Sequence, residues 1–274
     1  MQTESEPMTE LEGKPARRRR RVNPETIPLR KLIPNLMTAG ALSSGVASLH
    51  FAQSGQFAKA LGCVVIAFVL DGLDGRAARY LKVTSRFGEK FDSIADFTAF
   101  GAAPAFLLYQ WQLKEGLGVW GAMIAAFYCL CAAFRLARFT YQARQQKLGA
   151  PVGRFFQGLP APACASAVLV PPMLSVSDTV NWVSPIWLTA TYTVVLALAM
   201  ISTLPMISIK GTRINRKLAK PFMLVAGVIT IGLIFDGWLT ASVLALCYLL
   251  TFPLGVILFA RQQRAAAQSA AVAT

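Results

Sequence analysis

Long apolar stretches dominate this chain and limit what it can fold into. The chain is 55% hydrophobic and only 15% charged, whereas soluble domains carry about 25% charged residues. A stretch of about 20 apolar residues matches the thickness of a bilayer. We therefore predict an all-α integral membrane protein, a bundle of about eight transmembrane helices, or six if two stretches are re-entrant. The stretches lie at 33–52, 57–71, 95–112, 117–135, 158–176, 185–206, 221–236 and 239–260.

The distribution of basic residues predicts the orientation of this bundle. Lys and Arg near the ends of spans collect on the cytoplasmic side of a membrane. With eight spans, all of the 27 basic residues except Lys59 and Lys114 fall on one side. We therefore expect both termini in the cytoplasm and a protein of the bacterial cytoplasmic (inner) membrane.

The net charge of +14 raises the question of a nucleic-acid partner. The run from Arg17 to Arg21 could serve as an RNA-binding or nuclear-import patch. A polybasic tail beside anionic lipid head groups explains it more simply. We therefore expect membrane lipids, and no nucleic acid, as partners. Disordered tails are predicted at 1–26 and 263–274, on either side of a membrane domain at 27–262.

Four aspartates stand at the edges of two apolar stretches, as Asp71-x-x-Asp74 and Asp92-x-x-x-Asp96. A carboxylate at the centre of a membrane helix costs about 2.5–3.5 kcal/mol, so such residues indicate a function. Residues three or four apart share a helix face, and a hairpin joined near 80–87 would bring both pairs together. Oxygen ligands without His or Cys select Mg²⁺, Mn²⁺ or Ca²⁺. We predict a metal site at the cytoplasmic surface, with two ions that clamp a phosphate displacement.

Glycines and arginines accompany the aspartates. Gly75 and Gly88 remove side chains where a ligand must approach the backbone, and Arg79 and Arg86 carry guanidinium groups suited to phosphate oxygens. A structural interpretation competes, because aspartates at span ends can cap helices or pair with Arg76 and Arg79. Four carboxylates and two glycines in this register favour a site.

At these residues the chain resembles the CDP-alcohol phosphatidyltransferase family. The family signature is D-x-x-D-G-x-x-A-R, about eight residues, then G-x-x-x-D-x-x-x-D, and every fixed position is matched. The resemblance implies that Asp71, Asp74 and Asp92 hold Mg²⁺ or Mn²⁺. It implies that Asp96 also contacts metal and, with Asp92, forms the catalytic pair, in which Asp96 is the general base for an acceptor hydroxyl. The CDP-binding residues that it implies are Gly75, Ala78, Arg79, Gly88 and Asn35.

Over roughly residues 30–260 the chain resembles the membrane-integral branch of this family that uses L-serine. Arg135 to Phe139 and Phe156 to Pro162 match that branch, whereas Thr140 stands where it usually has Asn. The branch implies transfer of the phosphatidyl group from CDP-diacylglycerol to L-serine, which gives phosphatidylserine and CMP. Arg138 and Gln157 are the candidate acceptor-binding residues, and the family tendency toward homodimers implies a homodimer.

Other functions stay open on the sequence. A sibling enzyme would use choline, inositol phosphate or glycerol phosphate as its acceptor. Choline needs an aromatic or acidic cage, and a phosphorylated acceptor needs additional cations. A cation transporter is the alternative of another class, because intramembrane carboxylates mark ion pathways. Against a transporter, all four aspartates fall on one side of the predicted bundle.

Overall fold

The computed structural model describes residues 29–81, 83, 85–147, 156–202, 205–206 and 219–251. The tails predicted at 1–26 and 263–274 lie outside these residues. A helix over Gly237–Thr251 ends the described part. The elements before it, with η marking π-helical segments, are α1 (Leu29–Gln53), α2 (Phe57–Tyr80), α3 (Arg86–Asp96), η1 (Phe97–Ala102), α4 (Ala103–Leu108), η2 (Tyr109–Leu113), α5 (Lys114–Leu117), α6 (Val119–Lys147), β1 (Phe156–Gln157), α7 (Ala161–Val168), α8 (Val170–Val176), α9 (Ile186–Ile201), β2 (Pro205–Met206) and α10 (Ala219–Phe235).

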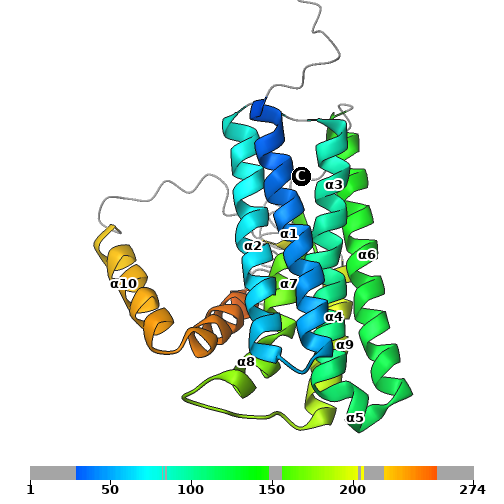
Figure 1. The fold of residues 1–274 in the computed structure, drawn as a ribbon, viewed down its shortest axis with the longest axis vertical. Coiled ribbons are helices and arrows are strands. Elements are labelled where there is room, and N and C mark those ends of the chain that lie inside the picture. Colours follow the sequence, from blue (N-terminus) through cyan, green and yellow to red (C-terminus); the bar gives the residue numbers. More distant parts are fainter. Residues whose placement is uncertain are drawn as a thin grey trace, which may run out of the picture.

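The described helices form an upright bundle, with α1 and α2 beside the continuous column of α3 to α5 and α6 at its edge (Figure 1). α7 and α9 lie behind these columns, and α10 stands away from them (Figure 1). Besides helices, the described residues contain two-residue strands, in which Phe156 pairs antiparallel with Met206. The predicted helical class is thus confirmed for this part of the chain.

Within the described part of the chain, three helices are long and apolar enough to cross a membrane, namely Leu32–Gln53, Phe87–Leu117 and Val119–Gln142. Shorter apolar helices cover Ile186–Ile201, Val225–Phe235 and Gly237–Thr251. α2 has 24 residues, but the charged side chains in its second half exclude it from this group. The arrangement agrees with a membrane protein, and the number of spans stays a prediction.

Several helix boundaries differ from those of the apolar stretches. α2 continues nine residues past 71 to Tyr80, and α6 continues past 135 to Lys147. The third stretch, predicted at 95–112, belongs to a helical column that already begins at Arg86. Hydropathy marks only the apolar part of a helix, whereas backbone hydrogen bonds carry the helix on into polar sequence. The sixth stretch is shorter than predicted, because α9 ends at Ile201 and β2 follows.

Hydroxyl groups join α1 to α2. Ser48 Oγ donates to the carbonyl oxygen of Ala60 at 2.9 Å, and Ser44 Oγ donates to that of Cys63 at 2.8 Å. The two helices are connected by a tight turn in which Gly55 has a φ of +72°, a conformation that glycine adopts without strain. This hairpin fixes the position of the second half of α2 along the axis of α1.

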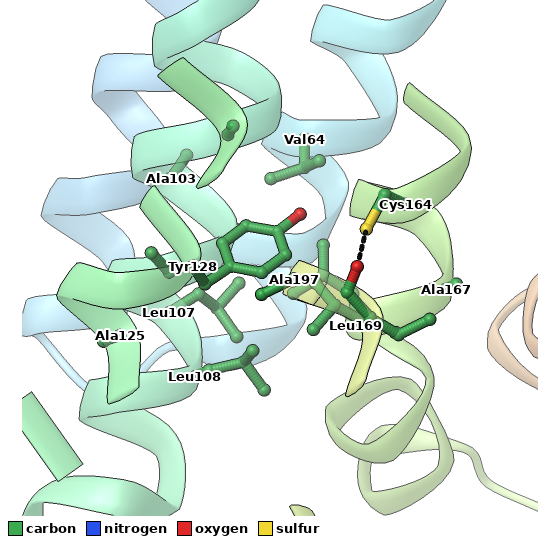
Figure 2. Packing of buried hydrophobic residues seen from close by; sticks show 14 of the residues in the cluster. Val64, Ala103, Leu107, Leu108, Ala125, Tyr128, Cys164, Ala167, Leu169 and Ala197 are labelled. Carbon is green, nitrogen blue, oxygen red and sulfur yellow. Dashed lines mark hydrogen bonds between the residues drawn. The ribbon is translucent and has the colours of Figure 1, made fainter. Parts of the chain in front are cut away.

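The column from α3 to α5 contains two π-helical segments, and η1 begins directly after Asp96. Such segments are rare and occur frequently at functional sites. Tyr128 of α6 packs against this column in the centre of the core, fully buried (Figure 2). Its hydroxyl donates to the carbonyl oxygen of Phe100 within η1, at 3.3 Å. Nearby, Cys164 Sγ donates to the Leu196 carbonyl oxygen at 3.6 Å, along the dashed line in Figure 2.

Prolines divide the fifth apolar stretch into two short helices. α7 ends at Val168 and α8 begins at Val170, with Pro171 and Pro172 in its first turn. Proline has no backbone N–H, so it is tolerated in the first turn of a helix but interrupts its interior. Because of this break, the fifth apolar stretch does not form one continuous helix.

Candidate metal and nucleotide site

Three carboxylates from two helices converge where α2 ends and α3 begins. One oxygen each from Asp71, Asp74 and Asp92 lies within 4.8 Å of the other two. All three potential metal ligands are carboxylate oxygens, which Mg²⁺ and Mn²⁺ bind in proteins. The residues present therefore fit such an ion.

Asp96 is the last residue of α3, one turn beyond Asp92. It does not belong to the group of three, but the negative charges of Asp71, Asp92 and Asp74 act on its carboxyl group. Asp96 therefore borders the same site.

The alternative interpretation, in which these aspartates pair with arginines, finds no support in the structure. Among the described residues, no lysine or arginine lies within ion-pair distance of any of the four. Arg76 and Arg79 are both exposed, and the side chain of Arg86 lies outside the described part. The negative charge of the cluster is thus not balanced by the cations that the structure describes.

 The five residues predicted to bind CDP line one cavity. At 310 Å³, the present cavity lies at the lower end of the range of about 300–1,000 Å³ that ligand pockets span. Its lining includes Asp74, Asp92 and all of the predicted CDP-binding residues, namely Asn35, Gly75, Ala78, Arg79 and Gly88.

The two glycines of this cavity differ in what surrounds them. A Cβ atom at Gly88 would lie 2.9 Å from Asn35 Oδ1 and 3.0 Å from Ser85 Oγ, so a side chain there would have to displace those two side chains. At Gly75 the nearest atom would be Arg79 Nη1, at 3.6 Å, which is an ordinary contact. Gly88 therefore permits close packing, whereas Gly75 leaves space open in the cavity.

Thr38 of α1 is a residue of this site that the sequence did not single out. Its Oγ1 donates to Asp74 Oδ2 at 2.6 Å and lies 3.0 Å from the carbonyl oxygen of Pro34. Thr38 and Asp74 are both only 5% exposed. The one signal in the sequence is a hydroxyl residue one turn after Pro34-Asn35, which is too weak to distinguish it from the other hydroxyls of α1.

The predicted acceptor residues lie toward α6 and α9. Arg138 lines a second cavity, of about 450 Å³, together with Arg135 and Phe139. Its Nη1 donates to the carbonyl oxygen of Ile201 at 3.4 Å. Gln157 belongs to β1, and its side chain lies outside the described part of the chain.

Arg135 carries a buried polar atom without a partner. Its Nε has no hydrogen-bond acceptor in the structure, and a buried donor left unsatisfied costs about 1–3 kcal/mol. The carboxylate that acts most strongly on its charge is that of Asp96. Arg135 thus lines the second cavity and also interacts electrostatically with Asp96.

Comparison with known proteins identifies one matching family and several relatives of this chain. A family model described as CDP-alcohol phosphatidyltransferase matches residues 31–187. The chain is 31% identical over 226 residues to the CDP-diacylglycerol–serine O-phosphatidyltransferase of Mycobacterium leprae, which covers 82% of this chain and 75% of that protein. A protein of the same name from Mycobacterium bovis is 29% identical over 256 residues, or 93% of this chain and 85% of its own. One from Helicobacter pylori is 40% identical over 139 residues, or 51% and 56%.

Proposed function

This chain belongs to the CDP-alcohol phosphatidyltransferase family, and on that premise we propose that it transfers the phosphatidyl group of CDP-diacylglycerol to the hydroxyl of L-serine. The products are phosphatidylserine and CMP. One observation carries the proposal: Asp74 and Asp92 of the carboxylate cluster line the same cavity as all five predicted CDP-binding residues. The names of the relatives support serine as the acceptor. Membership in an enzyme family argues against the cation transporter.

We propose that Asp71, Asp74 and Asp92, bordered by Asp96, hold Mg²⁺ or Mn²⁺, with two ions in the full site. The bound ions supply positive charge that neutralises the pyrophosphate of the donor. Arg79 adds a guanidinium group for the phosphate oxygens. Because Gly75 has no side chain, the nucleotide can approach the backbone at this point of the cavity.

Asp96 is the proposed general base, with Asp92 as its catalytic partner. A serine hydroxyl is a weak nucleophile until a base takes its proton in the transition state. As Asp96 accepts that proton, the serine oxygen forms a bond to the phosphorus that carries the diacylglycerol. The bond from this phosphorus to the CMP oxygen breaks, and CMP leaves. Arg138 and Gln157 are the proposed residues for the acceptor.

The membrane arrangement follows from the charge distribution. We propose eight spans around the domain at 27–262, with both termini and the site on the cytoplasmic face of a bacterial inner membrane, and disordered tails at 1–26 and 263–274. The helices whose length and composition allow them to cross a membrane support a membrane location. A homodimer is proposed from the family resemblance.

The direct test is release of CMP by the purified protein. CDP-diacylglycerol is mixed separately with L-serine, choline, glycerol phosphate or inositol phosphate, in Mg²⁺ or Mn²⁺ and after thorough chelation. We expect CMP release with L-serine, its loss on chelation and its return when metal is added back. Release only with another acceptor would replace serine, and unchanged turnover after chelation would remove the metal from the proposal.

A further inference from the structure

Three hydroxyl groups of α1 hydrogen-bond to α2, but they do not have the same kind of partner. Ser44 and Ser48 reach backbone carbonyl oxygens of α2, at 2.8 and 2.9 Å. Thr38 instead reaches a carboxylate oxygen of Asp74, at 2.6 Å. The first two bonds join helix to helix, whereas the third joins α1 to a side chain of the acidic cluster.

The bond from Thr38 has the features of one that fixes a carboxylate. Its hydroxyl has a single proton and two acceptors in reach, the Pro34 carbonyl oxygen at 3.0 Å and Asp74 Oδ2 at 2.6 Å. Hydrogen bonds to ionised acceptors are shorter and stronger than those between neutral groups, so the proton belongs to the Asp74 bond. Both side chains are buried, and water competes little for either.

The position of this bond leaves the rest of the carboxylate facing the cluster. Thr38 and Asp74 both line the cavity that Asp92 borders. A carboxylate held through one lone pair of Oδ2 keeps its remaining lone pairs for another ligand. Groups that hydrogen-bond to a metal ligand orient it, and their loss typically costs 10–100-fold in metal affinity.

We propose that Thr38 is a positioning residue, whose hydroxyl fixes the Asp74 carboxylate for cation binding. The inference rests on the metal site of the proposed function. It concerns a residue outside the family signature quoted above, and it assigns Thr38 no contact with the reacting atoms.

The test compares three variants for binding of Mn²⁺, measured by titration calorimetry on purified protein without substrate. Thr38→Val keeps the shape but removes the hydroxyl, and Thr38→Ser keeps the hydroxyl. Ser48→Ala is the matched control, because it removes an α1–α2 bond of similar length that ends on a backbone oxygen. We expect the Kd for Mn²⁺ to rise by about 10–100-fold in Thr38→Val, and to stay near the wild-type value in the other two.

A second readout separates positioning from folding. In CMP release, the Mn²⁺ concentration for half-maximal activity should rise in Thr38→Val, while the turnover at saturating Mn²⁺ recovers. Thr38→Ala serves as the alternative if Thr38→Val does not purify in a folded state. An unchanged Mn²⁺ affinity in the folded variant would overturn the inference, as would an equal loss in Ser48→Ala. A wild type that releases CMP without binding Mn²⁺ would overturn the metal site itself.

Discussion

Asp236 and the carboxylate cluster between α2 and α3 lie in different parts of the molecule, and their surroundings differ. Asp236 stands at the turn between α10 and the helix that follows it. It accepts hydrogen bonds from Leu239 N at 2.9 Å, Ser177 Oγ at 2.5 Å and Thr179 N at 3.1 Å. The cluster between α2 and α3 instead sets carboxylates against one another, with oxygens of three within 4.8 Å.

The hydrogen-bond donors around a carboxylate distinguish one that stabilises the fold from one that serves a function. The protein itself supplies the donors for Asp236, which caps the following helix and ties it to the segment after α8. The hydrogen bonds from the Leu239 amide and the Ser177 hydroxyl hold the pKa of Asp236 well below its usual range. In the cluster, Thr38 donates to Asp74, but the carboxylates also lie close enough to repel one another. A positively charged ligand would offset this repulsion.

The largest expected effect comes from breaking the cluster. Asp92→Asn and Asp96→Asn should each lower CMP release by at least about 10²-fold, within the range for loss of an acid–base group. Both variants should still insert and purify, because removing one of several like charges relieves repulsion. Activity is measured at saturating substrates beside thermal unfolding. Full activity in Asp96→Asn would remove its role as general base.

Asp236→Asn should have the opposite profile, a loss of stability with turnover kept. At neutral pH its melting temperature should fall by several degrees, because three donors lose a charged acceptor. A depressed pKa contributes stability above the unfolded-state value of about 4, and this contribution disappears as the pH falls below it. The difference in melting temperature between wild type and variant should therefore narrow on acidification. A difference that does not change with pH would show that the charge of Asp236 is not responsible.

The smallest expected effect concerns the start of α3, which carries half of the cluster. Ser85 caps this helix by accepting the Gly88 amide at 2.9 Å. Ser85→Ala should cost about 0.5–2 kcal/mol of local stability, seen as faster amide exchange in the first turn and a few-fold loss of activity. Ser93→Ala is the control, since that hydroxyl only returns to the Glu89 carbonyl oxygen at 3.1 Å. Equal effects of the two variants would contradict a role for the cap.

The sequence predicted that the aspartates of α2 and α3 come together because the determinants are local. Aspartates three and four residues apart must share a helix face, and the short link after Arg79 returns the chain beside the end of α2. That α1 packs against both helices was not predicted. The π-helical segments were not predictable, since an extra residue in a helical turn leaves no mark in a continuous apolar stretch. Thr38 was missed because its hydroxyl resembles those of Ser44 and Ser48 until its partner, 36 residues away, is known.

The hydrogen bonds between α1 and α2 also bear on how the chain enters the bilayer during biosynthesis. α2 is not among the helices that would cross on their own composition, and a polar group left unsatisfied in hydrocarbon costs several kcal/mol. Paired with α1, its backbone oxygens at Ala60 and Cys63 accept the serine hydroxyls. We therefore expect α1 and α2 to enter the bilayer together as a hairpin, because α1 can cross by its own length and composition and its serine hydroxyls find acceptors on α2.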